Sequence, residues 1–319
     1  MSTVQKEVDE RTNLTASNKF ELLLFRLGVT PQSEQRELFG INVFKVREIM
    51  VMPTVTAVAN STPHLMGVTN IRGQVIPVIN LPAAVGCEAK NGLNILLVTE
   101  YARTTQGFAV EEVDEIVRLD WSQVLSAEAS TSAGGLITSI ARLDGDVHNT
   151  RLAQVLDVEQ ILRTVMPPAG PEISSETIGP RVSLPPGSVI LAADDSMIAR
   201  TLIEKGLSAM GAPFVMTKSG REAWDRLQEF AAKAEAEGKP VSSKVALVLT
   251  DLEMPEMDGF TLTRKIKQDP RFRSIPVVIH SSLSGTTNES HVKTVGADAY
   301  VGKFVAEELA DTIRSMLSR

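Results

Sequence analysis

Short apolar runs that end in acidic or hydroxyl side chains mark the carboxyl-terminal half of the chain. The run over residues 245–250 is unbroken, has the length of a strand, and is followed at once by Asp251. An uninterrupted apolar run of this length is typical of a parallel strand that is buried on both faces. Three similar runs cover residues 188–193, 275–280 and 297–302. The pattern predicts four neighbouring strands of one parallel sheet.

Stretches of helical periodicity alternate with these runs. The spacing of apolar residues predicts helices over residues 196–210, 221–237, 260–268, 287–295 and 306–317. Five β/α repeats of this kind favour a flavodoxin-like, doubly wound α/β fold, (βα)5. Residues 231–243 are longer than such a repeat needs, and we expect a lengthened helix and loop there.

The amino-terminal half shows a different pattern, in which many short strand-like runs follow one another. They cover residues 20–27, 38–46, 67–71, 74–80, 93–101, 107–119, 136–143 and 147–156. Glycine-containing turns at 71–75 and 143–147 favour hairpins, because glycine accepts the positive φ that tight hairpin turns require. This half is therefore predicted to be all-β, with one or two small antiparallel barrels.

A proline-rich stretch separates the two halves. Its closely spaced prolines bias the chain toward extended conformations and predict a semi-rigid linker. A ligand for a proline-recognition domain is the alternative interpretation. We therefore expect a polar lead over residues 1–19, an all-β domain over 20–165, a linker over 166–187 and an α/β domain over 188–319.

Composition limits the compartment and the partners. The hydrophobic content of 43% and charged content of 22% are those of a soluble globular protein, and the net charge of -7 argues against nucleic acid as the main partner. The single cysteine, Cys87, has no internal disulfide partner, which fits a reducing cytoplasm. The sequence shows neither a signal peptide nor an apolar run of membrane-spanning length, so no membrane insertion is expected.

Candidate chemistry gathers where the predicted parallel strands end. Asp194 and Asp195 follow the first run and Asp251 follows the central one, while Ser281 and Lys303 follow two others. The carboxyl ends of parallel strands share one edge of the sheet, so these side chains are expected to converge. The alternative for any single residue is an acid that merely ends a strand.

Three carboxylates in one place need a compensating charge. Two carboxylates about 4 Å apart repel by roughly 4 kcal/mol at an effective dielectric of 20. Ligands that are all oxygen favour Mg²⁺, which also takes a phosphate oxygen readily. Beside such a metal Asp251 can attack phosphorus and form an acyl phosphate, which Lys303 and the Ser281 hydroxyl would stabilise.

Residues 188–319 resemble receiver domains of response regulators of the CheY type. The resemblance implies that Asp194 and Asp195 are the acid pair of the metal site, that Asp251 is the phosphoacceptor and a metal ligand, and that Glu253 binds the metal through its backbone carbonyl. It further implies a conserved role for Lys303 and switch roles for Ser281 and Tyr300. Phe304 stands where the family has proline, which removes the reason to expect a cis peptide bond there.

A second acidic group, residues 111–115 of sequence Glu-Glu-Val-Asp-Glu, lies in the all-β half. A metal site is one interpretation. The favoured one is that strand alternation places these acids on the solvent face of an edge strand.

The stretch 63–81 resembles the signature of CheW-type chemotaxis coupling domains, and residues 39–49 and 149–162 add to the match. The family fold is a pair of SH3-like barrels that bind chemoreceptor tips and the regulatory domain of the CheA histidine kinase. Asn80 stands where the family usually has Asp. Arg72 and Gly73 are either a simple hairpin turn or, as we favour within the longer match, a turn beside a partner-binding surface.

A coupling domain followed by a receiver resembles the CheV-type chemotaxis adaptors. The resemblance implies an adaptor that couples chemoreceptors to a CheA-type kinase at arrays on the inner face of the membrane, and whose coupling is modulated by phosphorylation of Asp251. It implies no enzyme activity beyond slow autodephosphorylation. Because the last predicted helix reaches almost to Arg319, we expect the coupling domain to be the output.

Two alternatives remain from the sequence. In the first, Asp251 is a phosphate sink that drains phosphoryl groups from the kinase, and the barrels only localise it. In the second, the chain is a phosphohydrolase of the haloacid dehalogenase type, since Asp251 and Glu253 loosely imitate the spaced acids of that family. That family requires Asp as its second acid.

Overall fold

The structure is a computed structural model of the full chain, and it describes residues 19–31, 33–101, 104–127, 136–144, 150–167, 178–282, 295–303 and 305–318. Contacts divide the chain into two compact units. The first unit is Lys19–Ala169, and the second contains Gly170–Arg319.

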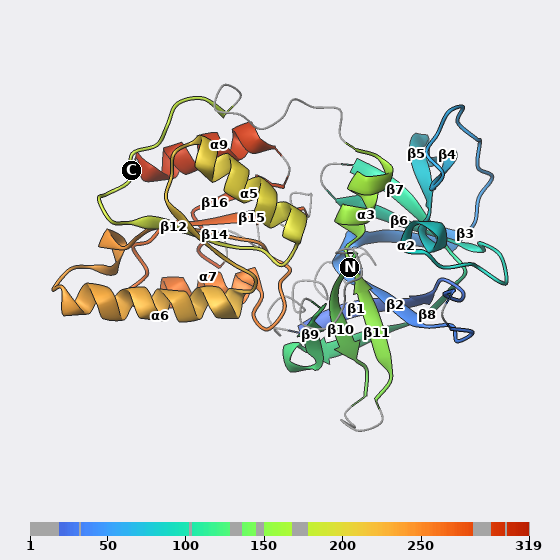
Figure 1. Ribbon diagram of the computed structural model, residues 1–319, viewed down its shortest axis with the longest axis horizontal. Helices are drawn as coiled ribbons and strands as arrows, with labels where there is room; N and C mark the ends of the chain where they lie inside the picture. The colour runs from blue at the N-terminus through green and yellow to red at the C-terminus, as the bar shows by residue number, and fades with distance from the viewer. Residues whose placement is uncertain are drawn as a thin grey trace, which may run out of the picture. The chain divides into compact units, whose positions relative to one another are not determined.

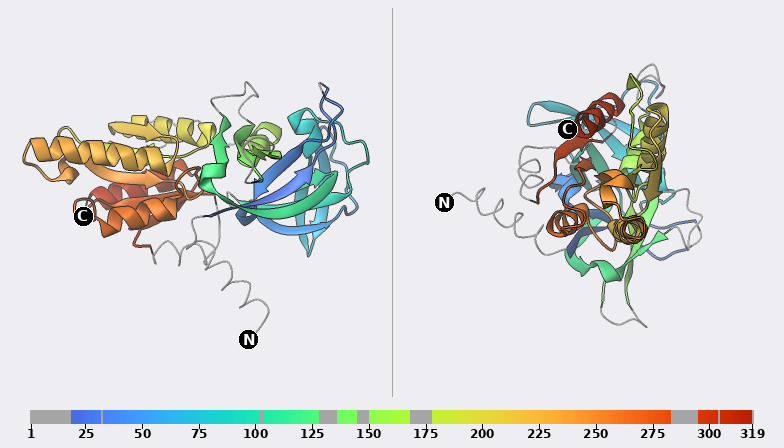
Figure 2. Two further views of the ribbon diagram at one scale, coloured as in Figure 1. Left: turned by 90° about the horizontal axis from the view of Figure 1, so that it is seen from below. Right: turned by 90° about the vertical axis from the view of Figure 1, so that its left-hand side faces the viewer.

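The first sheet of the first unit has six strands in the order β8-β1-β2-β11-β10-β9. Neighbouring strands are antiparallel except β2 and β11. All six strands contribute to one buried apolar cluster that includes Leu22, Leu119 and Val155, so the sheet curls around its own core (Figure 1; Figure 2). The bounds are β1 Lys19–Arg26, β2 Leu38–Asn42, β8 Glu112–Asp120, β9 Val124–Ser126, β10 Ile137–Arg142 and β11 Leu152–Leu156.

The second sheet of this unit has five strands in the order β3-β6-β7-β5-β4. Its core contains Ile76, Leu96 and Ala109, so this sheet also encloses a cluster of its own. The predicted all-β fold with two small barrels is thus confirmed, but each sheet contains one parallel pair, β2 with β11 and β5 with β7, where only antiparallel pairs were expected. The bounds are β3 Val46–Val51, β4 Leu65–Ile71, β5 Gln74–Asn80, β6 Ile95–Tyr101 and β7 Thr104–Val110.

A third cluster joins the two sheets. It combines Phe25 of β1 and Phe108 of β7 with Ile161 of a helix. Two short α-helices, α2 Leu81–Val85 and α3 Val158–Val165, were not predicted. Both begin at a capping side chain, since Asn80 accepts the Ala83 N–H and Asp157 accepts the Gln160 N–H.

Two predicted strands of the first unit are interrupted. The run 38–46 ends as a strand at Asn42, whose side chain accepts the Phe44 N–H at the start of the 3-10 helix η1, Val43–Lys45. The run 107–119 is broken at Glu111, which lies between β7 and β8. A second 3-10 helix, η2 Trp121–Gln123, leads into β9, which was not predicted. Polar side chains that bind the backbone divide the longer apolar runs.

The second unit contains a five-stranded sheet in the order β13-β12-β14-β15-β16, and every neighbouring pair is parallel. This order is that of a flavodoxin-like, doubly wound sheet, so the predicted fold class is confirmed. The strand β13 had not been recognised as a separate apolar run. The bounds are β12 Val189–Ala193, β13 Phe214–Thr217, β14 Val245–Thr250, β15 Val277–Ser281 and β16 Ala299–Gly302.

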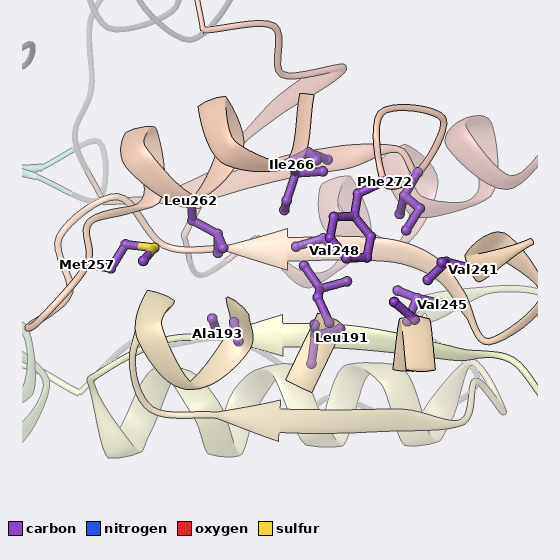
Figure 3. Close-up of a cluster of buried hydrophobic side chains, with 14 of the residues drawn as sticks. Leu191, Ala193, Val241, Val245, Val248, Met257, Leu262, Ile266 and Phe272 are labelled. Atoms are coloured by element: carbon purple, nitrogen blue, oxygen red, sulfur yellow. The ribbon is translucent and has the colours of Figure 1, made fainter. Parts of the chain in front are cut away.

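Helices cover both faces of this sheet (Figure 1). One buried cluster packs β12 and β14 against α6 and α7, and its members Leu191, Val248 and Ile266 are drawn in Figure 3. The other cluster packs the opposite face against α5 and α9 through Leu207 and Ile313. The bounds are α5 Met197–Ala209, α6 Gly220–Ala236, α7 Gly259–Gln268 and α9 Ala306–Leu317. The helix predicted over 287–295 falls outside the described residues except for its last position.

The lengthened segment after the middle of α6 is present as predicted. Ala231 and Ala234 are buried on α6, and Val241 of the short 3-10 helix η4, Val241–Ser243, packs against the same cluster as Val245. The extension therefore covers the end of the sheet at which β14 begins.

Candidate functional site

Five residues singled out from the sequence stand at the carboxyl-end edge of the parallel sheet. Asp194 and Asp195 follow β12, and Asp251 follows the adjacent strand β14. Ser281 is the last residue of β15, and Lys303 comes directly after β16. The topology therefore brings residues far apart in the sequence to one edge, as parallel strands require.

Lys303 connects two of the acids. Its Nζ lies 2.9 Å from Asp194 Oδ2 and 2.9 Å from Asp251 Oδ2. All three side chains are at least 95% buried. Charges so far from water are tolerated only when they are paired and hydrogen-bonded, and a mobile surface ion pair would not have this geometry.

The second oxygen of each acid is held by the backbone. Asp194 Oδ1 accepts the Ser196 N–H at 3.0 Å, and Asp251 Oδ1 accepts the Leu252 N–H at 2.7 Å. Ser196 in turn caps α5 by accepting the Ala199 N–H. Each carboxylate is thus fixed from two sides, which limits the reorganisation that a reaction at the carboxylate requires.

Asp194, Asp195 and Asp251 fit a divalent cation. One oxygen from each lies within 4.8 Å of the others, and among the described residues no other group of acids, histidines or cysteine comes together in this way. A site built only from carboxylate oxygens suits a hard cation such as Mg²⁺, Mn²⁺ or Ca²⁺.

The other residues of the sequence analysis lie nearby or beyond the described part of the chain. Ser281 is buried, and its backbone carbonyl accepts the Lys303 N–H at 2.9 Å. Tyr300 is half-buried on β16, where it pairs with Ile279 of β15. Glu253 is half-buried in the loop between Asp251 and α7. Phe304 lies outside the described residues. The roles of Ser281, Tyr300 and Glu253 remain predictions.

Arg72 and Gly73 form the turn of the β4–β5 hairpin, as predicted. Both have positive φ, 50° and 87°, and Asn70 Oδ1 accepts the Gly73 N–H at 2.8 Å. The Arg72 side chain is 73% exposed and lies 2.9 Å from Glu48 of β3. The predicted hairpin is therefore confirmed, and the partner-binding role of this turn remains a prediction.

Comparison with known proteins assigns both units. Residues 21–166 match the CheW-like domain, and residues 190–314 match the response regulator receiver domain. Chemotaxis protein CheV3 of Helicobacter pylori is 29% identical over 309 residues, which are 95% of this chain and 96% of that protein. The chain is a CheW-like domain joined to a receiver domain, and over almost its whole length it is similar to the CheV-type chemotaxis proteins.

Two further comparisons concern the receiver part alone. Chemotaxis protein CheY1 of Helicobacter pylori is 30% identical over 130 residues, which are 40% of the CheV-type chain and 95% of CheY1. The solved receiver domain of the histidine kinase CKI1 from Arabidopsis thaliana, complexed with Mg²⁺ and BeF₃⁻, is 27% identical with a TM-score of 0.38, covering 46% of this chain and 95% of that one.

A CheV-type chain is a chemotaxis coupling adaptor that carries a phosphorylatable receiver, and nothing supports the haloacid dehalogenase alternative. The CheW-like domain associates this adaptor with components of chemotaxis arrays. Within the described part of the chain, no helix is both long enough and apolar enough to cross a membrane.

One prediction for the coupling domain of this CheV-type chain is wrong. Glu111 is 2% exposed and does not lie on a solvent face. It occupies the break between β7 and β8, where its carboxylate accepts the N–H groups of Lys90 and Asn91 and pairs with Arg36 at 3.0 Å. Strand alternation does not extend through a break, so it could not place this residue. The other acids of the cluster, Glu112, Asp114 and Glu115, are exposed as predicted.

Sequence reasoning missed a buried arginine of the receiver. Arg200 on α5 donates to the backbone carbonyls of Asp194 at 3.0 Å and Asp195 at 2.7 Å. It shares the buried side of the helix with Ile203 and Leu207, and a cation on an apolar stripe was the available signal. Arg200 is a positioning residue, because it holds the backbone from which both acids project.

A glycine behind Asp251 was missed as well. A Cβ at Gly259 would lie 2.0 Å from the Asp251 carbonyl oxygen, far inside contact distance. The Gly259 N–H also donates to the Leu252 carbonyl at 2.9 Å. Only glycine allows the start of α7 to approach the backbone of Asp251 this closely.

Proposed function

We propose that this CheV-type adaptor accepts a phosphoryl group on Asp251 from a CheA-type histidine kinase, and that the modified receiver adjusts how its CheW-like domain joins chemoreceptor tips to that kinase. The observation that carries the proposal is the buried bridge from Lys303 to Asp194 and Asp251, 2.9 Å on each side, next to Asp195.

The transfer needs a nucleophile that is ionised and held in place. An Asp251 carboxylate oxygen attacks phosphorus, the bond from phosphorus to the donor histidine nitrogen breaks, and the imidazole keeps the electron pair and takes a proton. The product is an acyl phosphate on Asp251. The Leu252 N–H and the Lys303 ammonium already contact the carboxylate, so little reordering is needed.

The chain's own residues also manage the charge that arrives. Lys303 lies close enough to Asp251 to pair with the transferred phosphoryl group. We propose that the Ser281 hydroxyl, at the end of the adjacent strand, donates a hydrogen bond to the same group. Asp194, Asp195, Asp251 and the Glu253 carbonyl would hold Mg²⁺, which would supply positive charge to this site. Asp194 would then need Lys303 less, because the metal compensates its charge.

Phosphorylation would act as a local electrostatic switch. It replaces the single charge of the Asp251 carboxylate with an acyl phosphate, which adds about one net negative charge and new hydrogen-bond acceptors at an edge where Lys303 contacts two carboxylates. We propose that Lys303, Ser281 and Tyr300 rearrange together, because β15 and β16 are paired through Ser281↔Gly302 and Ile279↔Tyr300. The receiver thereby has two states that the coupling domain can sense.

The test is transfer of labelled phosphate from a phosphorylated CheA-type kinase to the full chain, with Mg²⁺ and with EDTA. We expect label on the wild type with Mg²⁺ only, and none on Asp251→Asn. Asp258→Asn is the matched control, because Asp258 caps α7 in the same loop and Asn caps equally well. Equal labelling of Asp251→Asn and wild type would refute the proposal.

A second arm separates the switch from a phosphate sink. Kinase activity is measured in receptor arrays that contain wild type or Asp251→Ala. We expect the two proteins to couple differently when the kinase is stimulated. Unchanged coupling, together with rapid loss of label from the wild type, would instead establish the sink.

A further inference from the structure

The chain segment before the receiver sheet packs on the receiver instead of extending away from it. We call residues 178–184 the strap. The strap lies in the region that the proline pattern assigns to the linker, and it precedes β12 by only a few residues. In Figure 1 this segment, drawn in yellow-green, passes the helices α9 and α5 before it enters β12.

An apolar anchor holds the beginning of the strap. Ile178 is 3% exposed and belongs to the same cluster as Leu207 of α5 and Ile313 of α9. Ile178 lies over Gly206, since a Cβ at that glycine would be 3.8 Å from Ile178 Cδ1. Val182 and Leu184 add partly buried contacts to the cluster.

A single arginine of α9 holds the strap's backbone. Arg314 Nε donates to the Pro180 carbonyl at 3.1 Å, and its Nη2 donates to the Ile178 carbonyl. Between these carbonyls Gly179 has a φ of 82°, and a Cβ there would lie 3.2 Å from the Arg314 guanidinium. The two nitrogens of the Arg314 guanidinium therefore bind carbonyls on either side of a positive-φ residue, a conformation that favours glycine.

Further along, the strap is tied to α5. The Val182 N–H donates to the carbonyl of Met210, the residue that ends α5, at 3.0 Å. The strap is thus hydrogen-bonded to both helices. These hydrogen bonds fix the register and the direction of the strap on α5 and α9, which apolar packing alone would not do.

The helix that holds the strap also continues from the reaction site. Lys303 precedes α9, and only residues 304 and 305 separate it from Ala306. Arg314 stands eight residues further along, or about 12 Å of helix. A shift of Lys303 toward a phosphoryl group on Asp251 would therefore move α9, whose Arg314 binds the carbonyls of Ile178 and Pro180.

We propose that the face formed by α5 and α9 is an intramolecular docking surface whose partner is the strap, and that phosphorylation of Asp251 changes its hold on the strap through Lys303 and α9. The proposal rests on the proposed phosphoryl transfer. The strap is the carboxyl-terminal part of the segment that leads from the CheW-like domain to the receiver, so its release would add residues to the connection between the two domains. This is how the receiver state reaches the coupling domain.

The test measures the hydrogen-exchange rate of the Val182 backbone amide in the full chain. In Arg314→Met, which keeps the methylenes but loses the donors, we expect exchange about tenfold faster, as the loss of charged hydrogen bonds implies. Gly179→Ala should act in the same direction from the strap side, without any change in α9. Asp311→Ala is the matched control, because it removes another partner of Arg314 and leaves the carbonyl bonds in place.

The second arm adds labelled phosphate from the kinase with Mg²⁺. We expect a several-fold change in Val182 exchange in the labelled wild type and no change in Asp251→Asn. Wild-type exchange in both Arg314→Met and Gly179→Ala would overturn the docking. Label on Asp251 without any change in exchange would overturn the relay alone, whereas absence of label would overturn the proposed function on which the relay rests.

Discussion

The two domains each bury a carboxylate at a strand end, but with different charge balance. In the coupling domain Glu111 is the buried acid of its cluster, and it accepts hydrogen bonds from Arg36 and two backbone N–H groups. In the receiver Asp194, Asp195 and Asp251 stand together with the cations Lys303 and Arg200, which leaves an excess of one negative charge. A balanced buried charge stabilises a fold, whereas an unbalanced one leaves room for a cation.

The partner of Glu111 also binds an exposed acid, Glu112, whose charge is screened by water. The guanidinium of Arg36 binds Glu112 at 2.7 Å and Glu111 at 3.0 Å. The pKa of Arg36 is raised above its usual range chiefly by the hydrogen bond to Glu112, with a further contribution from Glu111. Glu111 therefore has the contacts of a structural residue.

The largest expected effect is on the balanced site. Glu111→Ala leaves the Lys90 and Asn91 N–H groups without this acceptor and removes the buried partner of Arg36, so we expect a loss of about 3 kcal/mol in the stability of the coupling domain. Urea unfolding in a Trp224→Phe background reports this domain through Trp121. Glu112→Ala, on an exposed side chain, should cost less than about 1 kcal/mol. Similar losses in both variants would contradict the comparison.

The next effect concerns the unbalanced site. Mg²⁺ at about 100 times its dissociation constant should stabilise the receiver by about 2.7 kcal/mol, because only the folded site binds it. A Trp121→Phe background reports the receiver through Trp224, and the Trp224→Phe background is the control. A shift of the coupling domain as large as that of the receiver would show that the metal acts elsewhere.

A smaller effect is expected where the backbone of the receiver site is close-packed. Gly259→Ala places a methyl group against the Asp251 carbonyl, and overpacking of this kind costs about 1–3 kcal/mol. A Cβ at Gly206 on α5 would make only an ordinary contact with Ile178 Cδ1 at 3.8 Å, so Gly206→Ala should be neutral or stabilise by up to about 1 kcal/mol. Both are measured by urea unfolding through Trp224. If Gly259→Ala is no less stable than Gly206→Ala, the close approach is not a constraint.

The smallest effect lies at a fully exposed acid. Hydrogen bonds from Lys244 and then Lys239 lower the pKa of Glu237 to about 2, from an unperturbed 4.5. Its folded pKa is depressed, so its stabilisation is present above pH 4.5 and is lost as the pH falls toward 2. The stability difference between wild type and Glu237→Gln should therefore shrink across that window in acid titrations monitored by Trp224. Glu229→Gln is the control, and a difference that is constant with pH would contradict the assignment.

Much of the receiver fold could be predicted, because its strands and their ends can be recognised from consecutive residues in the sequence. An apolar run followed by Asp251 or by Lys303 identifies a strand end, and parallel pairing then brings the ends together without further information. Arg200 and Gly259 were missed because their importance arises from contacts with backbone atoms of other segments. Such contacts leave no periodic trace in the sequence.

The coupling domain was harder to predict for a related reason. Its strands are short and interrupted, and alternation predicts a face only while a strand continues. At Glu111 the chain passes from β7 to β8, so the rule that correctly placed Glu112 outside failed one residue earlier. The helices α2 and α3 were missed because they have only five and eight residues, too few for helical periodicity to stand out from the neighbouring strand-like runs.

The strap also decides where the receiver can be cut from the rest of the chain. The apolar pattern suggests a fragment that begins at Ser188, but such a fragment would lack Ile178 and uncover apolar side chains of α5 and α9, among them Leu207 and Ile313. Exposed apolar surface of this kind promotes self-association. Dimers of a receiver shortened to Ser188 would therefore report the missing strap, and a fragment that begins upstream of Ile178 should remain monomeric under the same conditions.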